Sequence, residues 1–402
     1  MRAGAPQAPP ADFQGLSNGR PMSDNQSIGE VEPKTTELFP DGIQLDSGIT
    51  FGPVTVAYET YGTLNEEGDN AILVCHALSG GAHAAGFLPG QGKPGWWDVM
   101  IGPNKGFDTD RYFVICANVL GSCYGTTGPA SINPATNRPY GMSFPVITIR
   151  DMVNVQKELV QHLGVRRLLS VAGGSMGGMQ ALQWAVTHPD MVQSVVALAT
   201  THRHSAQQIA FNEVARRAVM ADDNWRHGDY YADGLRPEKG LKLARMVGHI
   251  TYLSDKGMEH KFGRRLRTRE RVGYDFQAEF EVETYLDHQG QSFVKRFDAN
   301  SLLYLTKALD YCDLGQGHPS LTAAFRDIDA RFLLIAYSSD WLYPPYQMKE
   351  VAQAIRRADG DSTYCEIHSD YGHDAFLLEH EQQQPLVKAF LDRSMNEMRA
   401  NR

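Results

Sequence analysis

The segment that decides the fold is Leu168-Leu-Ser-Val-Ala-Gly173-Gly174-Ser175-Met176-Gly177-Gly178-Met179-Gln180. Its apolar first half predicts a buried strand, and the apolar spacing after the serine predicts a helix. Between such a strand and helix, Gly-x-Ser-x-Gly forces the serine into a strained, exposed elbow, and Gly173 and Gly177 let the two elements pass closely. We therefore predict that Ser175 is a nucleophile; the alternative is a glycine-rich turn with a structural role only.

Short apolar or β-branched runs elsewhere in the chain predict further buried strands. They span residues 71–75, 112–117, 168–172, 192–199, 331–337 and 363–367. Helical periods lie between them, clearest at 151–164, where Thr148 and Asp151 predict a capping box and Gly164 ends the helix. Residues 49–51 and 54–61 predict a hairpin around Gly52-Pro53. Strands that alternate with helices after an antiparallel start indicate an α/β fold, with a mostly parallel sheet and helices on both faces.

The chain divides into three parts. Residues 1–36 are rich in Pro, Ala, Asn, Ser and Gln, which predicts a disordered or loosely attached tail. Residues 37–200 and 311–402 carry the alternating strands and helices and predict the core domain. Residues 201–310 are polar and helical without convincing strand runs, so we predict that they form a helical lid inserted into that core.

Charge and hydropathy restrict the partners and the location. The 402 residues contain 38 Lys and Arg against 47 Asp and Glu, a net charge of −9 with histidine neutral. No basic field therefore favours nucleic acid or an anionic membrane. Nothing approaches 18 consecutive apolar residues, and the N-terminus lacks the apolar run of a secretory signal, so we expect a soluble protein in the cytoplasm.

Signals for disulfides and metals are weak. The five cysteines are odd in number and contain no Cys-x-x-Cys pair, which argues against a disulfide framework or a zinc ribbon. His202-Arg-His204 could clasp a metal, but a role at a strand end is favoured because further ligands are not nearby in the sequence. We expect no metal.

A serine nucleophile needs a base and a group that orients the base. In a sheet of this type the chain order is serine, then a carboxylate, then histidine, each after a later strand. Asp340 follows the strand predicted at 331–337, and His373 follows the last strand in a short glycine-containing loop. We predict His373 as the base and Asp340 as its partner, with Asp370 as the competing carboxylate.

The oxyanion of an acyl transfer needs two backbone N–H donors. One is expected from Met176, the residue after the serine, and one from the loop after an early strand. That loop contains Ala77, Leu78 and Ser79. We predict Leu78 as the donor, with Ala77 or Ser79 as alternatives.

Several separated blocks together resemble the homoserine O-acetyltransferases of the α/β-hydrolase fold. They are Cys75-His-Ala-Leu-Ser-Gly, Pro94-Gly-Trp-Trp-Asp, Gly128-Pro-Ala-Ser-Ile-Asn-Pro-Ala-Thr, Gly173-Gly-Ser-Met-Gly-Gly-Met-Gln, Leu243-Ala-Arg-Met-Val-Gly-His-Ile-Thr-Tyr-Leu-Ser-Asp, Arg296-Phe-Asp-Ala-Asn-Ser-Leu and Gly372-His-Asp-Ala-Phe-Leu. The resemblance runs from about residue 37 to the C-terminus and leaves the N-terminal tail outside.

The resemblance implies transfer of an acetyl group from acetyl-CoA, through an acyl-enzyme, to the hydroxyl of L-homoserine. The product, O-acetyl-L-homoserine, belongs to methionine biosynthesis. Acetyl-CoA is then a cosubstrate, no cofactor is permanently bound, and the lid helices pair two subunits into a homodimer. By motif, the nucleophile, the base and its orienter are Ser175, His373 and Asp340. The resemblance also assigns Arg245 to the homoserine carboxylate and Asp374 to its amino group, and it places Tyr252 near the reacting groups.

Four alternatives remain. Similar transferases take succinyl-CoA, but those of the succinyl type have an arginine two residues after the triad aspartate, where this chain has Leu342. An unpaired carboxylate in a closed pocket costs several kcal/mol, so acetyl is favoured. The loop at 77–81 favours homoserine over serine as the acceptor. An esterase or thioesterase has no use for both Arg245 and Asp374, and a non-catalytic binding protein typically lacks a triad member.

Overall fold

The computed structural model describes residues 27–268 and 270–400. Its centre is an eight-stranded sheet in the order β1-β4-β8-β5-β11-β12-β13-β14. These strands are β1 (Lys34–Leu38), β4 (Val54–Tyr61), β5 (Ala71–Cys75), β8 (Phe113–Ala117), β11 (Leu168–Gly174), β12 (Ser194–Leu198), β13 (Arg331–Tyr337) and β14 (Ser362–Ile367). From β8 to β14 every neighbouring pair is parallel, whereas β1 and β4 are antiparallel. The predicted α/β class is confirmed.

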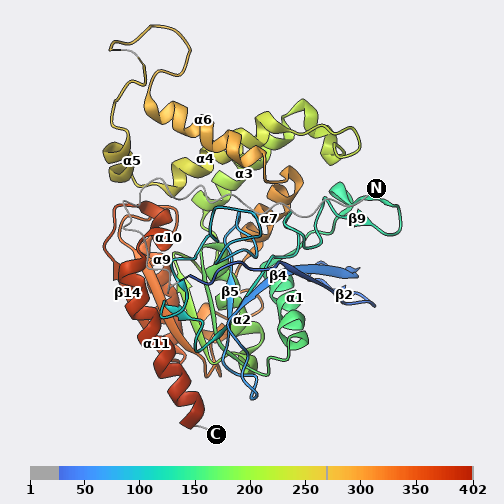
Figure 1. Cartoon of the computed structure of the whole chain (residues 1–402), viewed down its shortest axis with the longest axis vertical. Helices are drawn as coiled ribbons and strands as arrows, with labels where there is room; N and C mark the ends of the chain where they lie inside the picture. Colours follow the sequence, from blue (N-terminus) through green and yellow to red (C-terminus); the bar gives the residue numbers. More distant parts are fainter. Residues whose placement is uncertain (1–26, 269, 401–402) are drawn as a thin grey trace.

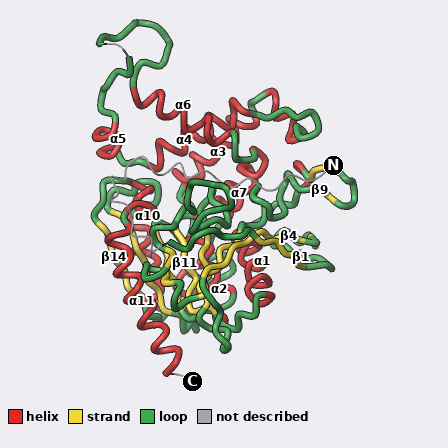
Figure 2. The backbone as a smooth tube through the Cα atoms, in the orientation of Figure 1, coloured by secondary structure: helices red, strands yellow, loops and turns green. Residues whose placement is uncertain are grey.

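Helices cover both faces of this sheet (Figure 2). The longer helices of the core are α1 (Ile149–His162), α2 (Met176–Thr187), α9 (Pro345–Arg357) and α11 (His380–Ala400). Apolar side chains of α1, α2 and α9 belong to the hydrophobic cluster on one face, and those of α11 belong to the cluster on the other. The predicted capping box of α1 is confirmed, because Thr148 and Asp151 exchange side-chain to backbone hydrogen bonds.

Strand β13 shows why the central strands are apolar throughout. Phe332 and Leu334 point into the cluster that contains α2, while Leu333 and Ile335 point into the cluster that contains α11. Successive side chains on a strand face opposite ways, so a strand covered on both faces needs apolar residues at every position. This burial fixes the position of each strand relative to its neighbours. The strand ends, which carry the candidate site, are therefore held in place.

The segment between β12 and β13 forms helices that lie over the sheet (Figure 1). These helices are α3 (Ala206–Met220), α4 (Glu238–Tyr252), α5 (Asp255–Lys261), α6 (Glu281–Val294) and α7 (Ala299–Tyr311). Helix α3 packs on α4 and α7, and α4 packs on α6. We call the helices α3 to α7 the lid helices, while the exact limits of the lid, 201–310, stay a prediction.

The antiparallel edge differs from the sequence prediction. Strand β3 (Thr50–Phe51) pairs with β2 (Ile43–Gln44), and β4 pairs with β1, so the predicted hairpin between 49–51 and 54–61 is wrong. Strand β1 begins at Lys34, inside the stretch predicted as a tail to residue 36. Its polar sequence hid an edge strand, since only Leu38 is buried there and edge strands tolerate polar side chains. Within residues 27–33 of that stretch, Val31 is buried and its amide donates to the Phe87 carbonyl at 2.8 Å, so this part is attached to the core. Residues 1–26 lie outside the described residues.

The remaining elements are short. They are β6 (Ile101–Gly102), β7 (Phe107–Asp108), β9 (Ile132–Asn133), β10 (Arg138–Pro139), α8 (Leu321–Ala324), α10 (Ala375–Leu378) and the 3₁₀ helices η2 (Gly141–Ser143), η3 (Pro189–Met191), η4 (Asp223–Gly228) and η5 (Gly372–Asp374). Among the helices described here, none is both long and apolar enough to cross a membrane.

Candidate active site

Ser175 occupies the predicted elbow between β11 and α2. Its φ of 57° and ψ of −123° lie in a region that a residue with a side chain rarely adopts. Two hydrogen bonds hold this backbone in place: the Ser175 N–H donates to the Leu198 carbonyl at 3.0 Å, and the Thr200 hydroxyl donates to the Ser175 carbonyl at 2.7 Å. The strained serine is therefore supported by the end of the neighbouring strand, β12.

Two positions around the elbow require glycine because backbone atoms of neighbouring segments approach them closely. A Cβ atom built on Gly177 would lie 2.0 Å from the Cys75 carbonyl oxygen, and one on Gly173 would lie 2.5 Å from the carbonyl carbon of Gly177. No side chain fits at either position. The contact at Gly173 brings β11 and α2 together as predicted, and the contact at Gly177 places the first turn of α2 directly against the end of β5.

His373 and Asp340 are brought together by the ends of β14 and β13. The His373 Nδ1 atom lies 2.8 Å from Asp340 Oδ2, and both side chains are buried. Asp340 Oδ1 accepts hydrogen bonds from the amides of Leu342 and Tyr343 at 3.0 and 2.8 Å. A carboxylate only accepts hydrogen bonds, so this contact favours the imidazole tautomer with its proton on Nδ1 and leaves Nε2 as the acceptor. Asp370 instead lies at the surface, 3.6 Å from Lys256.

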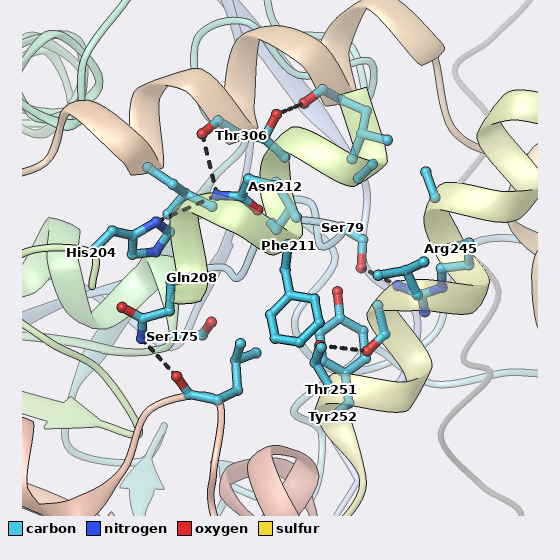
Figure 3. A pocket seen from close by; sticks show the side chains of 18 of the residues that line it. Ser79, Ser175, His204, Gln208, Phe211, Asn212, Arg245, Thr251, Tyr252 and Thr306 are labelled. Carbon is cyan, nitrogen blue, oxygen red and sulfur yellow. Dashed lines mark hydrogen bonds between the residues drawn. The ribbon is translucent and has the colours of Figure 1, made fainter. Parts of the chain in front are cut away.

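A cavity between the core and the lid helices opens onto Ser175, the predicted nucleophile (Figure 3). Five of the predicted site residues line it: Leu78, Ser175, Arg245, Tyr252 and Leu342. The predicted base lies next to this lining, since its ring stacks on Tyr343 at a centroid distance of 4.9 Å. The structure thus places the predicted serine at the cavity and the predicted histidine and aspartate next to its lining.

Arg245 and Asp374 give one part of this site a cation and an anion. The Arg245 guanidinium, from α4, lies 4.7 Å from the centre of the Phe293 ring and 5.6 Å from that of Tyr252, and it donates to the Ser79 hydroxyl at 3.3 Å (Figure 3). Burial raises the pKa of Asp374 to about 6, although His373 and Arg245 favour its ionised form. An amino acid zwitterion matches this pair of charges.

The loop after β5 contains the predicted oxyanion donor. The Gly80 amide donates to the Ala77 carbonyl at 2.9 Å, which makes a turn with Leu78 and Ser79 at its corners. His76 supports this turn from the core, because its Nδ1 atom lies 2.8 Å from the Ala77 carbonyl and its Nε2 atom accepts from the Val119 amide at 3.1 Å. Burial lowers the pKa of His76 to about 4, so it is neutral and structural.

The second expected donor, the Met176 amide, lies in the first turn of α2. Amides in that turn have no partner within the helix, and the helix dipole favours negative charge there. Together with the Leu78 turn, this gives the site two candidate donors near Ser175. The assignment of these two amides stays a prediction.

Sequence reasoning missed a buried polar network that begins at Tyr343, in the lining of the cavity. The Tyr343 hydroxyl lies 2.8 Å from His204 Nε2, and His204 Nδ1 lies 3.3 Å from Asp310, which pairs with Arg216 at 2.7 Å. His204 is therefore held by hydrogen bonds to protein groups. Within the described residues, no group of three His, Cys, Asp or Glu side chains is arranged to hold a metal ion. No sequence pattern links these four distant positions.

Comparison with known proteins gives the same family. The chain matches the family model of the α/β hydrolase fold over residues 70–380. It is 58% identical to the homoserine O-acetyltransferase of Methanosphaerula palustris over 91% of this chain and 75% of that protein. The homoserine O-acetyltransferase of Solidesulfovibrio magneticus is 55% identical over 92% of this chain and 94% of its own length.

Solved structures agree on the fold. The homoserine O-acetyltransferase of Bacillus anthracis has a TM-score of 0.85 and 32% identity, covering 90% of this chain and 98% of that one. An esterase has a TM-score of 0.82 and 33% identity, covering 90% and 100%. The fold alone is therefore shared by transferases and hydrolases, and the sequence relatives above decide between them. This chain belongs to the homoserine O-acetyltransferase family of the α/β hydrolase fold.

Proposed function

We propose that this protein transfers an acetyl group from acetyl-CoA to the side-chain hydroxyl of L-homoserine, with Ser175 as the acyl carrier. The product is O-acetyl-L-homoserine for methionine biosynthesis. The observation that carries the proposal is the cavity in which Ser175 and Arg245 both lie, beside the His373–Asp340 pair. The family membership supports the choice of substrates.

In the first half-reaction the serine is acetylated. His373 Nε2 takes the proton of the Ser175 hydroxyl while the oxygen attacks the thioester carbon. The amides of Leu78 and Met176 stabilise the oxyanion. As the tetrahedral intermediate collapses, the C–S bond breaks and the CoA thiolate leaves with the proton from His373. Asp340 keeps the imidazole in the required tautomer and stabilises its charged form.

In the second half-reaction the acetyl group passes to homoserine. Arg245 binds the carboxylate and Asp374 binds the ammonium group, and this orients the hydroxyl toward the acetyl carbon with Tyr252 alongside. His373 removes the hydroxyl proton as the new ester forms, and the proton then returns to Ser175. With a pKa of about 6, Asp374 is ionised at neutral pH and is available as a partner for the ammonium group.

Leu342 supports acetyl rather than succinyl as the acyl group. It lines the cavity, and among the described residues of that lining Arg245 is the only lysine or arginine. If Arg245 binds the acceptor carboxylate, a succinyl carboxylate has no cation left to pair with. Burying such a charge unpaired costs several kcal/mol.

Hydrolysis is the second candidate, because an esterase shares the fold at 33% identity. In an esterase water would discharge the acyl-serine. The buried Arg245 and Asp374 favour transfer, since an attack by water uses neither charge. The lid helices over the cavity also restrict the access of water to the acyl-enzyme.

The lid helices also suggest how two subunits associate. Large apolar side chains are exposed on α3 and α4, among them Val214 and Leu243, each about half exposed at 52%, and Ile250 at 42%. Apolar patches exposed on a surface mark protein interfaces, and we infer that these side chains belong to one. A homodimer that pairs through the lid helices, acetyl-CoA as a transient cosubstrate with no permanent cofactor, and a cytoplasmic location complete the proposal.

A half-reaction experiment tests the assignment of Arg245. We expect Arg245→Ala to be acetylated by acetyl-CoA at a rate close to that of the unchanged protein, while discharge by homoserine requires a far higher homoserine concentration. Lys239→Ala, at an exposed position of the same helix, is the matched control and should change neither step. Equal loss of both half-reactions in Arg245→Ala would contradict the role of this arginine in acceptor binding.

A further inference from the structure

Ser79 is contacted by two arginines from the lid helices and their connections. Arg245, from α4, donates to the Ser79 hydroxyl at 3.3 Å. Arg296, from the connection between α6 and α7, donates to the Ser79 backbone carbonyl at 3.0 Å and to the Tyr124 hydroxyl at 2.8 Å. The two guanidinium groups lie 4.7 and 5.1 Å from the centre of the same ring, that of Phe293. The arginines are therefore fixed relative to each other.

Arg296 contacts the turn that contains Leu78, the proposed oxyanion donor. Ser79 and Leu78 are the two corner residues of the turn closed by the hydrogen bond from Gly80 to Ala77. The amide of the first corner residue in such a turn makes no bond within the turn, so the Leu78 amide is available to an oxyanion. The direction of that amide depends on how firmly the whole turn is held.

Two side chains hold backbone carbonyls of the turn. His76 bonds the Ala77 carbonyl from the core side, and its own ring is fixed by the Val119 amide. Arg296 bonds the Ser79 carbonyl from the lid side through a charge-assisted hydrogen bond, which is about twice as strong as a neutral one. Without Arg296, the Ser79 carbonyl would lose this charge-assisted hydrogen bond, and the backbone of the turn would be held from the lid side only indirectly, through the contact of Arg245 with the Ser79 hydroxyl.

We propose that Arg296 is a positioning residue that aligns the Leu78 amide with the developing oxyanion by holding the Ser79 carbonyl. This inference rests on the proposed function, because it takes Leu78 as the oxyanion donor. It also explains why lid and core meet at this turn: the lid helices supply part of the machinery for transition-state stabilisation, besides covering the cavity. Small displacements of a donor matter because its effect depends on distance in a site of low dielectric constant.

The position of the turn is used in both half-reactions, and this gives the proposal a distinctive signature. An oxyanion forms when acetyl-CoA acylates Ser175 and again when homoserine attacks the acyl-enzyme. Removal of a complete oxyanion donor costs on the order of 100-fold to 1,000-fold in rate, so misalignment of one donor should cost less, roughly 10-fold to 100-fold. Both rate constants should fall by a similar factor while the affinity for CoA is unchanged.

The test uses the full chain with Arg296→Met, Arg296→Lys and Tyr124→Phe. Arg296→Met keeps the aliphatic stem against Phe293 but donates nothing, Arg296→Lys can still donate to the Ser79 carbonyl, and Tyr124→Phe removes only the second partner of Arg296. Acylation and discharge are measured separately by single-turnover mass spectrometry, and binding of a tetrahedral adduct former, an acetyl-sized trifluoromethyl ketone, is measured with CoA binding as reference. Thermal melting monitors the fold.

We expect Arg296→Met to slow both half-reactions and to weaken the binding of the trifluoromethyl ketone by a similar factor. Arg296→Lys should recover part of both losses, and Tyr124→Phe should react at near-normal rates. Rates within twofold of the unchanged protein in Arg296→Met would overturn the proposal, as would loss in only one half-reaction. A fall in rate with unchanged ketone affinity would equally overturn it. Failure of the proposed function is distinguishable, because the unchanged protein would then fail to acetylate Ser175 or to pass the group to homoserine.

Discussion

At the scale of single residues, the site depends on polar groups whose geometry is fixed by backbone amides. Asp340 is the clearest case. Its Oδ1 atom accepts two amide hydrogen bonds, so its Oδ2 atom is directed at His373 Nδ1 at 2.8 Å. The carboxylate therefore favours one orientation and one tautomer of the imidazole. A neutral amide at this position would favour another tautomer.

We predict that Asp340→Asn folds normally but loses activity. An asparagine can keep its oxygen on the two amides, yet it then presents an NH₂ group to His373 and favours the tautomer with the proton on Nε2. Comparable changes in serine enzymes lower kcat by about 10⁴-fold. The measurement is kcat from CoA release, with thermal melting as the control for folding. An activity within tenfold of the unchanged protein would remove Asp340 from the proposed mechanism.

Asp374 gives a second prediction at this scale, on stability and its pH dependence. Burial raises its pKa from the usual 3.8 to about 6, so the folded protein binds this proton more tightly than the unfolded chain does. The free energy of unfolding therefore falls as pH rises from about 4 to 6, and above pH 6 the ionised group costs about 3 kcal/mol. Asp374→Asn removes that cost, and it also removes the proposed partner of the homoserine ammonium group.

Urea unfolding at pH 8 and pH 4 measures this effect. We expect Asp374→Asn to be more stable than the unchanged protein at pH 8, by up to about 3 kcal/mol, with a much smaller difference at pH 4. Discharge of the acyl-enzyme by homoserine should be strongly weakened in the same variant. Equal destabilisation at both pH values would mean that burial does not penalise the Asp374 charge.

At the scale of elements, the strand–elbow–helix unit of β11 and α2 positions Ser175, the proposed nucleophile. The first turn of α2 approaches the end of β5 so closely that Gly177 has no room for a side chain. We predict that Gly177→Ala separates these elements and destabilises the protein by about 4 kcal/mol or more, a size characteristic of backbone clashes and overpacking in a core. Loss of soluble, active protein should accompany it.

Gly92→Ala is the matched control for this prediction. A Cβ atom on Gly92 meets nothing within 4 Å, and the backbone there needs no positive φ. Its melting temperature and activity should equal those of the unchanged protein. If Gly177→Ala also retained normal melting and activity, the close contact between α2 and β5 would be incorrect.

Elements that follow local rules were predictable from the sequence, and those that depend on distant partners were not. The capping box of α1 and the strands β5 and β13 agree with the sequence prediction, because periodicity and capping are encoded within a few residues. Strand β1 was missed, since its polar sequence becomes a strand only through pairing with β4.

The site shows the same division. Ser175, Asp340 and His373 each follow a recognisable strand, so their placement could be predicted from chain order. Arg245 was assigned only through the family resemblance, because nothing in its local sequence separates it from other arginines of the lid helices. Arg296 had no assigned role at all, since its contact with the Ser79 carbonyl joins positions more than 200 residues apart.

At the scale of the whole molecule, the lid helices combine an inner face on the cavity with an outer face of exposed apolar side chains. We predict that two chains pair through that outer face. Leu243→Asp combined with Val214→Asp should convert a dimer into a monomer, as measured by light scattering after size-exclusion chromatography, because a charge buried at an interface without a partner is strongly unfavourable. The variant should remain folded by circular dichroism.

Ile49→Asp is the control for the dimer prediction. Ile49 is similarly exposed, at 49%, but it lies beside the β2–β3 pair rather than on the lid helices. Its variant should keep the mass of the unchanged protein. A monomeric unchanged protein, or a dimer that persists in the double variant, would place the subunit contact elsewhere or remove it.

The central claim is that acetyl transfer passes through Ser175, and mass spectrometry of the acyl-enzyme tests it most directly. The protein is mixed with acetyl-CoA without an acceptor, digested and mapped, and a parallel sample is chased with L-homoserine. The account predicts an increase of about 42 Da on the peptide that contains Ser175, discharged by homoserine with formation of O-acetyl-L-homoserine. Absence of this adduct, or discharge by water as fast as by homoserine, would contradict it.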